Sequence, residues 1–289
     1  MSDIEKISIN DVHESELYIM WTHILSAFML DNTEQSSTNY GISEEDRNFL
    51  KKLHKILLGI DNCLKTIDIS CLFLKRFYGK KYYESKEVLL ADYMTYHYEM
   101  ICYKTATLKD LYFKLINHLY CLGLHKKKCN WENINSRRTI INNPILFKIL
   151  ESNYESLKSV LEDNRNDSAH EGCINVHTLV EMELYEFLTS SNAIISIEEL
   201  SALDKMQFKY KIKDAKQNLI KEAISIRCIS FVLTKCIFCS LADRFSEVIS
   251  DNIKDYYKPS IEKGIIALSQ SNKCMHCNNS CCDFWENCR

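Results

Sequence analysis

This chain of 289 residues contains only 6 glycines and 2 prolines, so it has few positions at which it can turn sharply. Tight turns depend on residues that accept a positive φ or that fix φ in advance, and sheet-rich folds therefore require many of them. Helices joined by short connections require far fewer. The scarcity of turn residues predicts an all-α fold.

The periodicity of apolar residues predicts where the helices lie. Residues spaced as on one face of a helix recur over residues 11–30, 43–78, 86–122, 144–162, 176–188, 197–203 and 213–249. Ser43, followed by acidic residues, is typical of a helix start. A break is expected near Gly59, and Gly123 stands where a C-terminal cap is expected.

The composition also bears on compartment and partners. The first fifteen residues do not resemble a signal peptide. The most apolar stretch, Cys228–Ala242, contains Lys235 and is shorter than the roughly 20 residues of a bilayer span. We therefore expect a cytoplasmic protein without a membrane partner, whose 14 cysteines are mostly reduced thiols. Because the formal net charge is −3, binding of nucleic acid would require a local basic cluster.

One segment, residues 164–172, has the composition of a catalytic site. Arg165 supplies planar, permanently charged donors for a phosphate, and His170 can take or give a proton near neutral pH. Asn166 could donate to a phosphate oxygen or orient the imidazole. If the backbone bends between them, these groups would suffice for RNA cleavage without a metal, because the ribose 2′-hydroxyl is the nucleophile. The alternative is a solvated junction between helices with ordinary surface residues.

The motif resembles that of the HEPN superfamily, in which a His follows an Arg after four to six residues and a polar residue, often Asn, stands directly after the Arg. Arg165, Asn166 and His170 match these positions. The resemblance covers roughly Lys86–Ser190, including the helices expected on both sides of the motif.

The resemblance implies a HEPN-like helical bundle with additional N- and C-terminal helices. It also implies a homodimer in which two motifs face one cleft and cleave RNA without a cofactor. Such proteins act as toxins or antiviral-defence effectors, and an antitoxin or regulatory protein is an expected partner. HEPN domains without activity bind RNA, a nucleotide or a protein, which is the alternative function.

On this interpretation the chain has four successive segments. Residues 1–85 are an N-terminal helical extension, and 86–190 are the HEPN-like core. Residues 191–270 are C-terminal helices that pack on the core, and 271–289 are a short Cys-rich tail.

Two further groups are candidates for the same site. Glu99, on the helix expected over residues 86–122, could pair with Arg165 and hold it ready, or could simply belong to a polar helix face. The connection after that helix could contact the RNA backbone, with an aromatic ring that could stack on a base, or could be a solvated loop. Its candidate residues are Lys126, Lys127, Lys128, Trp131, Arg137 and Arg138.

The tail contains a possible structural zinc site. Cys274 and Cys277 have the C-x-x-C spacing that lets two thiolates reach one tetrahedral ion. Cys282 (or Cys281) and Cys288 would complete it, with His276 as a possible substitute. Reactive thiols in a disordered tail and an iron–sulfur site are alternatives. If the tail is the functional part, the helical body would be the scaffold of an interaction protein.

Overall fold

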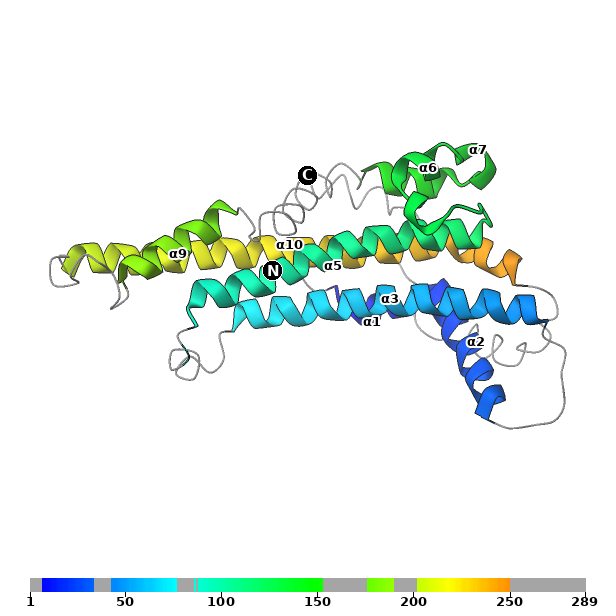
Figure 1. Ribbon diagram of the computed structural model, residues 1–289, viewed down its shortest axis with the longest axis horizontal. Helices are drawn as coiled ribbons and strands as arrows, with labels where there is room; N and C mark the ends of the chain where they lie inside the picture. Colours follow the sequence, from blue (N-terminus) through cyan, green and yellow to red (C-terminus); the bar gives the residue numbers. More distant parts are fainter. Residues whose placement is uncertain are drawn as a thin grey trace. The chain divides into compact units, whose positions relative to one another are not determined.

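The fold is all-α in the computed structural model, which describes residues 7–33, 43–76, 86, 88–152, 176–189 and 202–249. These residues form helices, turns and short connections, and no strand occurs among them (Figure 1). A further helix begins at residue 144. The helices with defined bounds are α1 (Ile9–His13), α2 (Glu16–Thr33), α3 (Glu44–Lys75), α5 (Leu90–Leu119), η2 (Lys126–Lys128), α6 (Trp131–Asn135), α7 (Arg138–Ile141), α9 (His177–Thr189) and α10 (Ala202–Val248).

The described residues group into two compact units, each assembled from separate stretches of chain. The first unit contains described residues within 62–108 and 176–230, and the second contains those within 7–61, 109–152 and 231–249. The long helices α3, α5 and α10 contribute residues to both units. The predicted segment limits near residues 85, 190 and 270 fall at or beyond the edges of the described ranges and stay a prediction.

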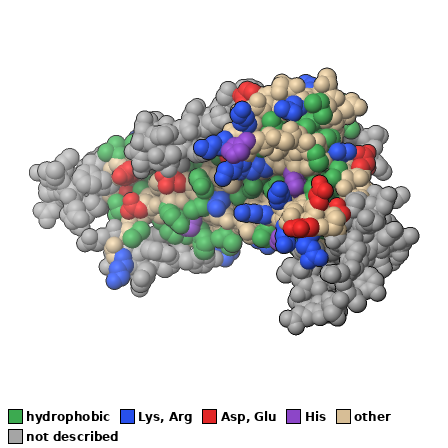
Figure 2. Space-filling model, turned by 45° about the vertical axis from the view of Figure 1, so that its right-hand side comes forward, with side chains coloured by type: hydrophobic (Ala, Val, Ile, Leu, Met, Phe, Trp, Pro, Cys, Tyr) green, Lys and Arg blue, Asp and Glu red, His purple; other side chains and the backbone are tan. Residues whose placement is uncertain are grey.

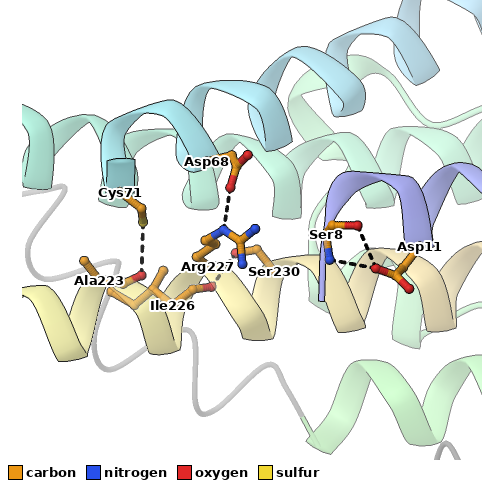
Figure 3. Close-up of polar contacts among 8 residues, drawn as sticks. All are labelled: Ser8, Asp11, Asp68, Cys71, Ala223, Ile226, Arg227 and Ser230. Carbon is orange, nitrogen blue, oxygen red and sulfur yellow. Dashed lines mark hydrogen bonds and ion pairs between the residues drawn. The ribbon is translucent and has the colours of Figure 1, made fainter. Parts of the chain in front are cut away.

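The first unit is held together by contacts between α3, α5, α9 and α10. The Arg227 Nε donates to Asp68 Oδ1 at 2.6 Å, and the Cys71 Sγ donates to the Ala223 carbonyl at 3.4 Å (Figure 3). On α5, the buried Tyr98 hydroxyl donates to Glu222 at 2.6 Å. Polar groups that are removed from water need such partners, so these bonds fix how the helices are oriented.

The second unit is built from α1, α2 and parts of the same long helices. The Tyr112 hydroxyl of α5 and the Thr234 hydroxyl of α10 lie 2.5 Å apart, both buried. At the chain's start, Ser8 donates through its amide and its hydroxyl to Asp11, at 2.7 and 2.8 Å, which is a capping box at α1 (Figure 3).

The pattern along α3 shows why this sequence forms a long helix. Eight of its nine buried apolar residues follow one another at alternating intervals of three and four positions, which is typical of helices packed lengthwise against others, and the ninth is Cys63. The eight are Leu50, Leu53, Leu57, Ile60, Leu64, Ile67, Cys71 and Leu74.

Several helix limits differ from those expected. No break occurs at Gly59, and α3 continues through it. The Leu111 side chain packs against this glycine, so that a Cβ added at Gly59 would lie 3.3 Å from the nearest Leu111 carbon. The single helix expected over residues 11–30 is divided into α1 and α2 by Glu14 and Ser15. Separate helices were expected over residues 197–203 and 213–249, whereas α10 runs without a break from Ala202 to Val248.

The end of α5 also differs. Leu122 N–H donates to the Asn117 carbonyl and Cys121 N–H to the His118 carbonyl, the two bonds of a Schellman cap. The left-handed residue of that cap is Cys121, whose φ is 50°. Gly123, which was expected to be the cap, also has a positive φ, 67°, but it stands two residues after the cap.

The cysteines agree with the expectation of reduced thiols. All eight that the structure describes are free, and six of them are buried. Burial raises the pKa of Cys71 to about 12, so this thiol behaves as a small apolar group.

Among the described residues one helix, Met206–Val248, is long and apolar enough to cross a membrane by length and composition alone. The core helix of a soluble protein passes the same test, and 61% of its most apolar window is buried inside the fold. The expected absence of a membrane partner stays a prediction.

Candidate nucleic-acid interface

The motif residues Arg165, Asn166 and His170 lie outside the described residues, as do the tail cysteines Cys274, Cys277, Cys282 and Cys288. The candidates that the structure describes are Glu99 and the six residues of the basic connection. No group of three or more His, Cys, Asp or Glu side chains is placed to hold a metal ion within the described part of the chain.

The basic connection, residues 124–138, is fixed to the end of α5 by Asn117. This side chain accepts a bond from the Leu124 amide and donates one to the Leu124 carbonyl, both at 3.0 Å. Such a pair imitates the backbone pairing of a sheet and directs the chain back over the outer side of α5. The segment is therefore an ordered part of the second unit.

Three of the predicted RNA-binding residues, Lys126, Lys127 and Lys128, form the 3-10 turn η2. All three side chains are exposed. His125 caps the turn, because its Nδ1 accepts from the Lys127 amide at 3.4 Å. None of the three ammonium groups makes an ion pair with the described residues. The turn therefore presents adjacent, uncompensated positive charges to solvent.

The residue after the turn anchors it. Cys129 is 8% exposed, and its thiol points back to the carbonyls of Leu124 and His125. Burial raises the pKa of Cys129, and the positive charge of Lys114 on α5 opposes that rise. Lys114 therefore lies close enough to η2 to act on it electrostatically, although the sequence alone gave this residue no role.

The other three predicted residues are engaged in holding the fold. Arg137 donates to the Leu122 carbonyl at 3.3 Å. Arg138 forms a two-pronged pair with Glu151 at 2.6 and 3.3 Å and lies over the ring of Phe147, 4.8 Å from its centre. Trp131 is half-buried, with its ring centre 6.3 Å from that of Phe147. A phosphate reaching Arg138 would have to compete with a bidentate carboxylate.

Glu99 is half-buried on α5, among the residues of the first unit, and it has an interaction partner. The six residues of the connection belong to the second unit. The pairing of Glu99 with Arg165 stays a prediction, because the second residue lies outside the described ranges.

A pocket of about 530 Å³ lies in the second unit between the turn before residue 144 and the end of α10. Its lining includes Arg244, Asp243 and Glu247, and so carries two carboxylates for one guanidinium. Arg244 is already bonded to the Leu119 carbonyl at 3.1 Å and to Glu247 at 3.1 Å. This balance disfavours a phosphate, and we do not include the pocket in the interface.

A second cluster of titratable groups lies where α1 meets α3. The His13 Nε2 is 2.8 Å from Asp61, whose side chain is 5% exposed, and the His13 ring stacks on Tyr18 at 4.2 Å. Burial and, secondarily, the charge of Asp61 raise the pKa of Tyr18 to about 12. Because the tyrosine stays neutral, the cluster acts as a structural joint rather than as a nucleophile.

Comparison of the chain with protein-family models, with curated proteins and with solved structures finds no match in any of the three. The resemblance of its motif to the HEPN superfamily therefore rests on Arg165, Asn166 and His170 and on the order of the helices around them.

Proposed function

We propose that this protein is a metal-independent endoribonuclease of the HEPN type that cleaves RNA through attack by the ribose 2′-hydroxyl. The observation that carries the proposal is the motif Arg165-Asn166-x-x-x-His170 in a chain whose described part is all-α. In this mechanism His170 transfers the proton, and Arg165 stabilises the charge that develops on the phosphate. Asn166 orients the imidazole or the phosphate.

The lysines of η2 support RNA as the substrate. Residues 109–152 contain eight Lys and Arg residues but only three Asp and Glu residues, in a chain with a net charge of −3. Exposed lysines attract the phosphate backbone by releasing its counterions. A local excess of this kind is what a slightly acidic protein needs in order to bind a polyanion.

The proposal extends to the biological setting. One motif supplies one Arg and one His, so two copies facing one cleft would provide both proton-transfer groups, and we propose a homodimer. A cytoplasmic toxin or antiviral-defence effector, held in check by an antitoxin or regulatory protein, fits this activity. We propose no metal in catalysis and only a structural zinc in the tail.

The test is cleavage of total RNA by the full-length protein in the presence of a chelator, with the fragment ends mapped. We expect fragments that end in a cyclic phosphate or a 3′-phosphate, because the 2′-hydroxyl is the nucleophile. His170→Ala should abolish cleavage without changing helicity, whereas Ser168→Ala, within the same motif, should retain it. Intact RNA with the wild-type protein, or full activity of His170→Ala, would contradict the proposal.

The second candidate function is an RNA-binding module without catalysis. It is favoured by the exposure of Lys126, Lys127 and Lys128, since this feature does not depend on the motif. The two functions separate in the same experiment: the module would retain RNA on the protein but leave it uncut, and His170→Ala would then bind and behave as wild type.

A further inference from the structure

The exposed lysines of η2 continue onto α5 and α3, which the sequence did not predict. The contacts between α3 and α5 in the second unit fix how the two helices run. His118 donates through its Nε2 to the Phe49 carbonyl at 3.0 Å, and its ring stacks on the Phe49 ring with the centroids 4.3 Å apart. Seven residues earlier on α5, Leu111 packs on Gly59 of α3. The two helices are therefore antiparallel along this line of contact, which we call the seam between α3 and α5.

The register of the seam places three lysines together. On α3, Lys52 and Lys55 lie between the contacts at Phe49 and Gly59, and both are exposed. On α5, Lys114 lies between the contacts at Leu111 and His118. Helical spacing sets Lys55 and Lys114 on the side of the seam that faces away from the buried residues. Lys51, one turn before Lys55, is exposed as well.

The electrostatic environment of His118 agrees with this register. Burial lowers the pKa of His118, the bond to the Phe49 carbonyl opposes that change, and the positive charge of Lys52 adds to the lowering. Lys52 on α3 therefore acts directly on a residue of α5, as Lys114 acts on the anchor of η2. One lysine thus lies near the anchor of η2 on the side of α5, and another lies near α5 on the side of α3.

We call this surface the basic face, and it consists of Lys51, Lys52, Lys55, Lys114, Lys126, Lys127 and Lys128. None of these side chains makes an ion pair or a hydrogen bond with the described residues. On the face that Figure 2 shows, several Lys and Arg side chains and histidines lie near one another, and Asp and Glu side chains are present on the same face. The described residues of the same segments also include acids: Glu44, Glu45 and Asp46 in the first turn of α3, Asp110 on α5 and Glu132 on α6.

The chemistry of the basic face indicates what it binds. Like charges one turn apart, such as Lys51 and Lys55, oppose helix formation by about 0.2–0.5 kcal/mol, and no carboxylate of the described residues forms an ion pair with either of them. Lysines are point charges that attract phosphates without reading bases. The aromatic residue of the basic connection, Trp131, is half-buried with its ring near that of Phe147. A helix that binds a membrane surface would present a stripe of apolar side chains, whereas residues 43–61 expose one large apolar side chain, Leu58.

We propose that the basic face is one continuous track for the sugar–phosphate backbone of RNA, and that α3 contributes three of its seven lysines. This inference rests on the proposed RNA substrate and adds where the strand runs beyond η2. It implies binding that depends strongly on salt and little on sequence, with single-stranded DNA of the same sequence bound similarly.

The test compares three triple variants of the full-length protein, each of which removes three exposed positive charges. They are K51Q/K52Q/K55Q on α3, K126Q/K127Q/K128Q on η2 and, as a matched control, K209Q/K213Q/K221Q on α10. The dissociation constant for a short single-stranded RNA is measured at several salt concentrations, in the His170→Ala background so that the probe stays intact. Circular dichroism checks the fold, and K51R/K52R/K55R, which keeps the charge, should bind as the parent does.

We expect the α3 and η2 variants each to lose roughly a hundredfold in affinity at about 0.1 M salt. Each phosphate contact with a single strand contributes about 0.7 to the steepness of log K against log salt, so the loss of three contacts makes that slope shallower by about 2. The control should change little. If the α3 variant binds like the control while the η2 variant weakens, the track does not reach α3, and the inference is wrong although the proposed function stands. If both weaken but the wild-type enzyme never cuts RNA, the inference stands and the nuclease proposal fails. Binding of the wild type to phosphatidylserine vesicles but not to RNA would overturn both.

Discussion

The start of α5 depends on a carboxylate that comes from another helix, and this dependence can be measured. Glu186 on α9 accepts the backbone N–H groups of Leu90 and Ala91 at 2.9 and 2.8 Å. These amides belong to the first turn of α5, where N–H groups have no partner within the helix. A negative charge at this end of a helix is also favoured by the helix dipole.

The expected effect of Glu186→Ala follows from the burial of the two amides. Leu90 is half-buried, so water can replace the lost acceptor at its N–H, whereas Ala91 is 2% exposed and its N–H would be left without a partner. A buried donor left unpaired costs about 1–3 kcal/mol, and loss of the charge near the helix end costs about 0.3–1 kcal/mol more. We expect a decrease of about 2 kcal/mol in the free energy of unfolding. Glu186→Gln, which keeps one carbonyl oxygen, should cost about half as much.

Urea denaturation at neutral pH gives the free energy, and hydrogen exchange of the Ala91 amide reports the local effect. The matched control is Glu183→Ala, an exposed glutamate on the same helix with no partner at α5. Exchange at Ala91 should accelerate in Glu186→Ala and stay unchanged in Glu183→Ala. Equal losses of stability in the two alanine variants would show that the carboxylate does not cap α5 in solution.

Two further substitutions test the second unit, both by urea denaturation. His13→Ala removes the 2.8 Å contact between the imidazole and the carboxylate of Asp61, which is 5% exposed, and we expect a loss of about 2 kcal/mol that His13→Ala with Asp61→Asn partly restores. A loss no larger than that of a half-buried control, His23→Ala, would contradict this. Gly59→Ala should raise the free energy of unfolding by about 0.5 kcal/mol. The gain in helix propensity of about 1 kcal/mol exceeds the cost of moving Leu111, whose side chain would lie 3.3 Å from the new Cβ. A lower free energy of unfolding would mean that Leu111 cannot move.

Much of the helical fold could be predicted from local patterns. The helix expected over residues 86–122 corresponds to α5, Leu90–Leu119, and the one expected over 176–188 to α9, His177–Thr189. In both, apolar side chains recur along the face that the fold buries, so the signal is contained in the segment itself. The break expected at Gly59 does not occur, because the low helix propensity of glycine is a local signal, whereas the contact with Leu111 comes from a distant segment.

The candidate interface was less predictable, because its geometry depends on contacts between distant residues. Nothing in residues 124–138 shows that Asn117 directs the connection back over α5. Nothing in α3 alone shows that Lys52 and Lys55 face α5 near the level of Lys114, since this inference depends on the pairing of Phe49 with His118. The sequence identified a run of basic residues, but not the neighbours that extend it.

The kind of cation turns out to be more informative than the number of cations. Arg137, Arg138 and Arg244 each donate to a carbonyl or carboxylate within the second unit, and Arg227 does so in the first. The guanidinium suits this task, since its planar set of donors can satisfy an acceptor while the group remains charged. The lysines of the basic face carry the same charge without such bonds. The run of basic residues in the sequence therefore includes two arginines, Arg137 and Arg138, that bond to the protein itself. It does not include the α3 lysines of the basic face, which make no such bonds with the described residues and which we propose contact the phosphate backbone.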